Sequence, residues 1–368
     1  MIEQLHLRNF AAFADLKLDL SPKINVIIGE NGTGKTQLLK ALYFCNKAIS
    51  DQTLSAEELL RTYRPHKPAL KYLIGDKGSQ KAEINCTMGA GQVVKASFSA
   101  NSRSLAQNEF KSTPEVAQPL LIPAKEVASF LKAMKSQKLS NEQKNALFDQ
   151  AYVDLIDKLT HSSAKEVLER IDHEPRFSET YLKLVEALGG QFNVRSIGTV
   201  FDIKFDKGFY SIIASEKHSR HGKLAFVGKR SDSVDMTAEG LRKLGNLQIL
   251  LANQQLRPGA GGILLWDEPE ANLNPKLMKL VVEVLLAFAR NGQQVVVATH
   301  DYVLLKWFDL LLDSGKGDHV RYHALSRDDE GQIAVESNDD YKYLNTNAIA
   351  NTFSELYDEE IKRSLGGR

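Results

Sequence analysis

The feature that most constrains the fold is the run from Gly29 to Thr36, which reads Gly-Glu-Asn-Gly-Thr-Gly-Lys-Thr. It fits the pattern G-x-x-x-x-G-K-[ST], a glycine-rich loop that binds phosphate. The apolar run 24–28 before it predicts a buried strand, and residues 37–43 after it predict a helix. A glycine-rich turn without a ligand is the alternative. The strand, loop and helix in this order favour an α/β fold that binds ATP or GTP.

Each residue type in the loop suits contact with a triphosphate. Glycines let the backbone wrap around the phosphates, so that N–H groups and a helix N-terminus face the anionic oxygens. Lys35 is expected to reach the β- and γ-phosphates, and the Thr36 hydroxyl is expected to hold Mg²⁺. The predicted nucleotide-binding residues of the loop are Gly29, Asn31, Gly32, Thr33, Gly34, Lys35 and Thr36.

Residues 263–269 form a second motif, Ile-Leu-Leu-Trp-Asp-Glu-Pro, in which an apolar strand ends in two acids. Asp267 is expected at the carboxyl edge of the strand, where it would hold Mg²⁺ directly or through water. Glu268 places a carboxylate where a general base must orient and deprotonate the attacking water. A surface turn with two acids explains the motif equally well by itself. The loop at Gly29 favours the catalytic interpretation.

A third element follows the acids. Asn274 is expected to cap a helix, Pro275 fits its first turn, and Gly292 ends it. The run 294–299 then predicts a strand that ends at His300. A right-handed crossover makes this strand parallel to the acidic one, so the acids and the histidine reach one edge of the sheet. A lone histidine at a strand end is more often structural, but this spacing favours contact with the γ-phosphate or the attacking water.

These motifs resemble the ABC-type ATPases of the branch that contains the SMC, RecF and OLD (overcoming lysogenization defect) proteins. Residues 2–10 and 16–20 resemble the two short strands that precede the loop in such heads. The resemblance implies an α/β P-loop ABC-type ATPase head with a mainly parallel central sheet, an antiparallel β subdomain and a helical insertion. It also implies that Glu268 is the catalytic glutamate, that His300 is the switch histidine, and that residues 271–274 form the D-loop.

The same resemblance implies ATP with Mg²⁺ as the ligands, and a homodimer or higher homo-oligomer that closes through its ATP-binding heads. Two expected motifs depart from the family pattern. The Leu-Ser-Gly-Gly-Gln signature is replaced by residues 236–243, where Thr237 and Gly240 are the predicted nucleotide contacts. The Q-loop candidate, 120–126, has no glutamine at its start, and a plain strand-to-helix turn is an equally good interpretation.

The chain between the motifs has two characters. Residues 70–100 and 193–230 alternate between apolar and polar and predict strands, whereas residues 125–190 predict helices. Two capping-box patterns, at 140–143 and 163–166, support these helices, and apolar residues over 147–159 lie on one helical face. The predicted division is an N-terminal part of the head at 1–122, a helical insertion at 123–192 and a C-terminal part at 193–368.

Composition agrees with a cytoplasmic ATPase. The apolar fraction of 43% supplies a sizeable core, and no run reaches the ~18 apolar residues of a membrane span. A signal-peptide pattern is missing at the start, and Cys45 and Cys86 form no metal pattern, so a reducing cytoplasm is expected. The net charge of +1 predicts no strong overall attraction to nucleic acid, although a local basic face leaves nucleic acid open as a partner.

Three functions from different classes are compatible with these features. The favoured hypothesis is an ATPase subunit that controls a separate nuclease or toxin-like effector, because residues 301–368 are too few for the nuclease domain that follows OLD-type heads. Such compact ATPases resemble subunits of the bacterial anti-phage systems PARIS and Septu, an analogy at the level of the fold. The alternative is a RecF-like ATP-dependent DNA clamp. A transporter's nucleotide subunit fits the opening strands and the signature less well.

Overall fold

The chain folds into two compact units. The first contains residues 1–121, 261–270 and 294–368, and the second contains residues 122–260 and 271–293. These units are spatial, whereas the three-part division of the sequence runs along the chain and stays a prediction. The computed structural model describes residues 1–75, 81–112, 116–135, 139–160, 167, 170–171, 173–197, 200–213, 223–256, 262–346 and 348–365.

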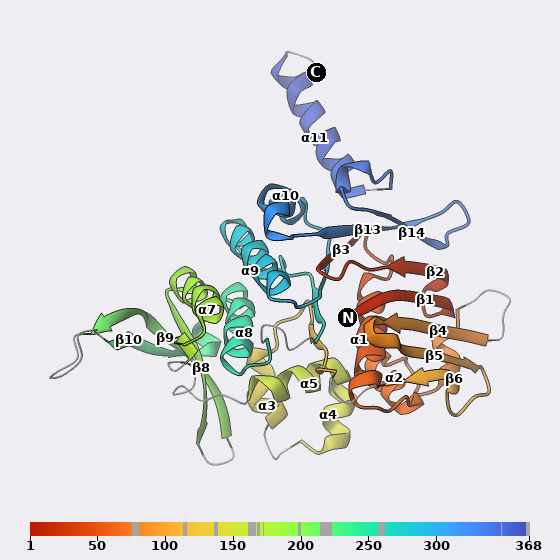
Figure 1. The fold of residues 1–368 in the computed structure, drawn as a ribbon, viewed down its shortest axis with the longest axis horizontal. Helices are drawn as coiled ribbons and strands as arrows, with labels where there is room; N and C mark the ends of the chain where they lie inside the picture. The colour runs from red at the N-terminus through yellow and green to blue at the C-terminus, as the bar shows by residue number, and fades with distance from the viewer. Residues whose placement is uncertain are drawn as a thin grey trace. The chain divides into compact units, whose positions relative to one another are not determined.

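The core of the first unit is a six-stranded sheet (Figure 1). Its inner strands are parallel, and only the β13–β14 pair is antiparallel among the pairs with assigned register. Every residue of β3, β11 and β12 is buried, as is expected of parallel strands covered on both faces. The predicted α/β class and the mainly parallel sheet are thus confirmed. The strand order is β14 (Ile333–Asn338), β13 (Val320–Arg327), β3 (Ile24–Gly29), β12 (Val295–Thr299), β11 (Leu264–Asp267) and β7 (Leu120–Ile122).

A second, antiparallel sheet belongs to the same unit. Buried residues alternate with more exposed ones along Phe13–Asp19 and Lys81–Met88, so one face of these strands packs on the core. The two short strands expected before the loop are present as its first two members. The strand order is β2 (Phe13–Asp19), β1 (Ile2–Phe10), β4 (Lys81–Met88), β5 (Gln92–Ser99) and β6 (Ala106–Lys111).

The helix that follows the loop is longer than the sequence pattern predicted. It starts directly at Lys35, because Gly34 adopts a left-handed conformation that turns the loop into the helix. It contacts both sheets of the first unit and is buried along most of its length. The helices of this unit are α1 (Lys35–Ser50), α2 (Ala56–Tyr63), α10 (Tyr302–Leu311) and α11 (Ala348–Ser364), with short 3-10 turns at Leu70–Leu73, Gly89–Gly91, Ser314–Lys316 and Tyr341–Tyr343.

The second unit combines helices with a three-stranded antiparallel sheet. Its strands are β8 (Gly190–Ile197), β9 (Val200–Ile213) and β10 (Lys223–Ser233) in the order β10-β9-β8. Its helices are α3 (Leu131–Lys135), α4 (Asn141–Leu147), α5 (Gln150–Leu159), α7 (Pro175–Leu188), α8 (Glu239–Ala252) and α9 (Met278–Arg290), with 3-10 turns at Ala128–Phe130, Val234–Met236 and Pro275–Leu277.

The apolar run at 147–159 is divided between two helices, which corrects the single helical face predicted there. Phe148 is extended and ends α4, and the Asp149 side chain accepts a hydrogen bond from the N–H of Tyr152 to start α5. Leu147 consequently remains 59% exposed. The local capping preference of aspartate therefore outweighs the apolar spacing. The capping box at Ser140 is present, whereas the pattern at 163–166 lies outside the described residues.

Within the described part of the chain, none of the helices has both the length and the apolar character needed to cross a membrane.

Candidate nucleotide site

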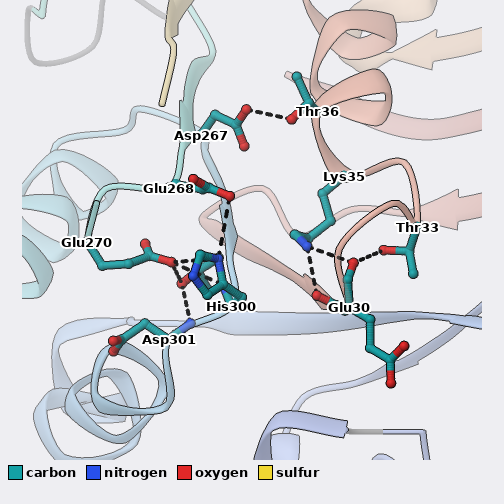
Figure 2. Close-up of polar contacts among 11 residues, drawn as sticks. Glu30, Thr33, Lys35, Thr36, Asp267, Glu268, Glu270, His300 and Asp301 are labelled. Carbon is teal, nitrogen blue, oxygen red and sulfur yellow. Dashed lines mark hydrogen bonds and ion pairs between the residues drawn. The ribbon is translucent and has the colours of Figure 1, made fainter. Parts of the chain in front are cut away.

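The phosphate loop lies between β3 and α1 in the first unit, and its lysine is buried. The Lys35 Nζ donates hydrogen bonds to the carbonyl oxygens of Gly29 at 2.7 Å and Glu30 at 3.0 Å. Burial lowers the pKa of Lys35, and the nearby carboxylates of Glu268 and Asp267 oppose that shift. The Thr33 hydroxyl also donates to the Glu30 carbonyl, at 2.8 Å. The loop is thus folded around an ammonium group (Figure 2).

Two glycines of the loop are required by close approach. A Cβ atom on Gly29 would lie 2.5 Å from the carbonyl oxygen of Leu325. Gly34 has a φ of +90°, and a Cβ there would lie 2.9 Å from the ring of Phe13. A side chain at either position would displace the loop from the strands beside it. The glycines therefore do more than provide a flexible turn.

Thr36 and Asp267 meet although they are far apart in sequence. The Thr36 hydroxyl donates to the Asp267 Oδ2 at 2.6 Å. The aspartate is only 6% exposed, and burial raises its pKa while the hydrogen bond from Thr36 opposes the shift. A hydroxyl and a carboxylate side by side are hard oxygen donors of the kind that Mg²⁺ binds. The two predicted metal ligands therefore lie at one place.

Glu268 directly follows that aspartate in a strained backbone conformation. Its φ is +45°, which is uncommon for a residue with a side chain. The N–H of Glu268 donates to the Ala298 carbonyl at 2.8 Å, which ties the turn to β12. The Glu268 Oε1 lies 3.5 Å from the Nδ1 of His300 (Figure 2). Strain of this kind is concentrated at functional sites and supports the predicted role of Glu268.

Two residues beside the predicted site escaped sequence reasoning. Glu270 is 7% exposed, and its carboxylate contacts the turn that carries His300. Arg327, at the end of β13, donates from Nη2 to the Gly32 carbonyl of the loop at 2.9 Å. Of the two, only Glu270 had a sequence signal, as an extra acid directly after Asp-Glu-Pro. The second contact joins positions 295 residues apart and leaves no local pattern.

The predicted signature residues belong to the second unit, whereas the loop belongs to the first. Thr237 follows the 3-10 turn Val234–Met236, and its backbone N–H donates to the Val234 carbonyl at 3.0 Å. A Cβ on Gly240 would lie 2.4 Å from the carbonyl oxygen of Asn272, so this glycine lets the start of α8 approach residue 272 of the predicted D-loop. The backbone segment that Gly240 approaches closely thus belongs to the same chain.

The Q-loop candidate also has a local structural role. The Glu126 carboxylate is buried and accepts hydrogen bonds from the N–H of Ala128 and from the Ser129 hydroxyl, the latter at 2.8 Å. It caps the 3-10 turn Ala128–Phe130. These contacts use the carboxylate inside the second unit, in agreement with the plain-turn interpretation of this segment.

A phosphate loop, an acidic strand end and a histidine strand end on one mainly parallel sheet define the class of the protein, a P-loop ATPase. The chain belongs to the family described as "AAA domain, putative AbiEii toxin, Type IV TA system", whose model matches residues 24–306. As a member of this ATPase family it is an ATP-binding protein.

Curated relatives include the DNA replication and repair protein RecF of Lactococcus lactis subsp. cremoris (strain MG1363), 40% identical over 60 residues, 16% of this chain and 17% of that protein. RecF of Acetivibrio thermocellus is 31% identical over 94 residues, 26% of each chain. The chain therefore spans only about a sixth to a quarter of the length of these relatives.

Among solved structures, an SMC head bound to the C-terminal winged-helix domain of ScpA aligns with a TM-score of 0.56 at 16% identity, over 93% of this chain and 98% of that one. The SMC head of Pyrococcus furiosus, with an extended coiled coil and bound to the C-terminal domain of ScpA, aligns with a TM-score of 0.53 at 15% identity, over 98% and 99%. At such identity the likeness establishes the fold alone, an SMC-type head.

Proposed function

We propose that the site hydrolyses ATP with Mg²⁺ and that its nucleotide state controls a separate effector protein. The observation that carries the hydrolytic part is the meeting of four side chains at one sheet edge. Thr36 and Asp267 are 2.6 Å apart, and Glu268 and His300 are 3.5 Å apart. These pairs supply a metal position next to a base.

The roles follow from the chemistry of each group. Lys35 and the loop amides bind the phosphates, and Thr36 and Asp267 hold Mg²⁺. When bound, Mg²⁺ neutralises charge that develops on the phosphate oxygens. Glu268 orients a water and accepts its proton as the water attacks the γ-phosphorus, while the bond from that phosphorus to the β–γ bridging oxygen breaks and ADP leaves. His300 contacts the γ-phosphate and thereby distinguishes ATP from ADP.

The control of an effector rests on the architecture of the head. We infer that two heads close around ATP, with Thr237 and Gly240 of one copy completing the site of the other. Two observations support a partner protein. The SMC heads with this fold are bound to ScpA, and the family description refers to a toxin–antitoxin system. An anti-phage system of the PARIS or Septu type is the setting we propose for such an ATPase.

A second function is favoured by the curated relatives. Their name, DNA replication and repair protein RecF, supports a DNA-associated ATPase that acts as a clamp. Such a clamp would bind duplex DNA only with ATP, and its affinity would fall steeply with salt. The net charge of +1 disfavours this function, because it gives no strong overall attraction to DNA. A local basic face is still compatible with that net charge.

One experiment separates the two functions. The Glu268→Gln variant is purified from its native cells with ATP and Mg²⁺, and the Lys35→Ala variant serves as the matched control that does not bind nucleotide. A nuclease or toxin-like protein that co-purifies in stoichiometric amounts only with Glu268→Gln supports effector control. Co-purification of DNA with repair factors, and of no effector, supports the clamp instead. ATP turnover that is unchanged in Glu268→Gln contradicts the assignment of the base.

A further inference from the structure

The proposed function leaves one buried carboxylate without a role. Glu270 directly follows the Asp-Glu-Pro motif and is 7% exposed. Its Oε1 accepts hydrogen bonds from the Thr299 hydroxyl at 2.7 Å and from the N–H of His300 at 3.1 Å. A single carboxylate oxygen therefore binds the last residue of β12 and the first residue after it.

These bonds fix the turn that carries the histidine. The Thr299 hydroxyl, which donates to Glu270, also accepts from the N–H of Asp301 at 3.0 Å. The Asp301 side chain in turn accepts from the N–H of Leu304 at 2.7 Å and caps α10. The backbone N–H groups of residues 300 and 301 are thus both satisfied by side chains, and this chain of hydrogen bonds runs from the carboxylate of Glu270 to that of Asp301 (Figure 2).

The imidazole of His300 lies between two carboxylates. Its Nδ1 is 3.5 Å from the Oε1 of Glu268 and 3.6 Å from the Oε1 of Glu270. The first carboxylate is the proposed base and must be available to water. The second is almost fully buried behind the turn, with 7% of its surface exposed. The two acids on either side of Pro269 therefore differ in what they can do.

The other oxygen of Glu270 indicates that packing alone does not explain this residue. Its Oε2 is buried and has no hydrogen-bond partner among the described residues. A buried carboxylate oxygen without a partner is costly, and an apolar residue would avoid that cost. Such groups in native structures call for an explanation. A requirement for negative charge beside His300 supplies one.

We propose that Glu270 is a positioning residue for the proposed switch histidine. Its hydrogen bonds hold the turn, and its charge keeps Nδ1 of His300 directed toward the carboxylates, which leaves Nε2 for the γ-phosphate. This inference rests on the proposed function, because it acts through His300. It assigns different work to the two acids: Glu268 touches the reacting water, and Glu270 acts only through the histidine.

The test uses the full chain and the variant Glu270→Gln. Glutamine keeps an acceptor for Thr299 and for the His300 N–H but removes the charge. We expect Glu270→Gln to lower kcat for ATP about ten- to 100-fold, the usual effect of losing a carboxylate that orients a functional histidine. KM and the unfolding temperature should stay at the wild-type values. Glu109→Gln, at a half-buried position of β6 paired with Lys95 and Lys111, is the matched control and should leave kcat unchanged.

A double-mutant cycle with His300→Ala decides the mechanism. If Glu270 acts through the histidine, Glu270→Gln lowers kcat no further once His300 has been removed. Full additivity of the two losses overturns the proposal, as does a wild-type kcat in Glu270→Gln. Glu268→Gln is measured in parallel. If it still turns over ATP normally, the proposed function has failed; if it is inactive while Glu270→Gln is normal, only the inference about Glu270 has failed.

Discussion

The phosphate-loop region and the signature region are both predicted to hold a nucleotide, but they differ in how much of their structure is already built. In the first, Lys35, Thr36 and Asp267 are held to one another or to the loop by hydrogen bonds within the first unit. In the second, Met236 is 78% exposed, and the tight contact is the backbone of Gly240 against Asn272. A site assembled in advance needs no partner to take shape, whereas the segment before α8, exposed at Met236, belongs to the region that we propose completes the site of another copy.

The largest effect expected from this comparison is on turnover. Glu268→Gln keeps the shape of the side chain but removes the proton acceptor, so kcat should fall about 10²- to 10⁴-fold while ATP affinity is retained.

Thr237→Val should also slow turnover, but it should leave ATP binding by a single head intact. Turnover as a function of protein concentration, with nucleotide affinity measured by titration, checks both. Loss of ATP affinity in Thr237→Val would contradict the idea that the signature region acts on another copy.

The next effect concerns stability rather than chemistry. In Gly240→Ala the new methyl group would lie 2.4 Å from the Asn272 carbonyl, and a backbone atom cannot move aside as a flexible side chain can. Alanine recovers about 1 kcal/mol of helix propensity, so we expect a net loss of about 1–2 kcal/mol in the free energy of unfolding. Denaturant unfolding measures it.

Gly89→Ala is the control for that substitution. Its Cβ would meet the Glu3 side chain at 3.5 Å and the Met1 carbonyl oxygen at 3.9 Å, both ordinary contacts, and the unfolding free energy should barely change. A fully stable Gly240→Ala protein would contradict the packing role of Gly240. In that case the glycine at position 240 would be explained by the nucleotide contact that the sequence predicts.

The two regions also differ in how far the sequence could predict them. The phosphate loop is a contiguous pattern whose chemistry lies in adjacent residues, so its strand, loop and helix follow from local rules. The expectation that the acids and His300 lie at one sheet edge required only the handedness of crossover connections, whereas Asp267 and Thr36 were linked through the Mg²⁺ that both were expected to hold. Arg327 could not be found this way, because its partner Gly32 lies on a distant segment. The break at Phe148 was missed because a single capping aspartate outweighed an apolar pattern.

A buried histidine in β13 predicts that the stability of the fold depends on pH. His323 in β13 lies beside β3, contacts Ser337 at 2.7 Å and Asn25 at 3.2 Å, and burial lowers its pKa to about 3. Arg321 adds to that shift and Asp339 opposes it. Below the ordinary pKa of histidine, the unfolded chain binds a proton at this residue and the folded chain does not. The contribution of His323 to stability is therefore full above about pH 6.5 and decreases toward about pH 3.

The expected loss from His323 is about 1.4 kcal/mol in the free energy of unfolding between about pH 7.5 and about pH 5.5. Urea unfolding at the two values measures it, and His323→Gln should remove that part of the pH dependence. His66→Gln, at an exposed position, is the control and should leave the pH dependence unchanged. An identical pH dependence in wild type and His323→Gln would show that this histidine is not a source of acid sensitivity.

The smallest expected effect concerns Arg327, which touches the phosphate loop from outside. Its Nη2 donates to the Gly32 carbonyl, and its Nη1 donates to the Gly331 carbonyl at 3.1 Å, so it ties the β13–β14 turn to the loop. Because the side chain is exposed, each bond contributes only about 0.5–1 kcal/mol, and Arg327→Ala should weaken ATP binding about threefold. Titration with a fluorescent ATP analogue measures this, with Arg363→Ala on α11 as the control for loss of a positive charge. If Arg327→Ala binds ATP as tightly as wild type, the loop is fixed by its own lysine and glycines, and its preorganisation lies entirely in the Gly29–Thr36 motif.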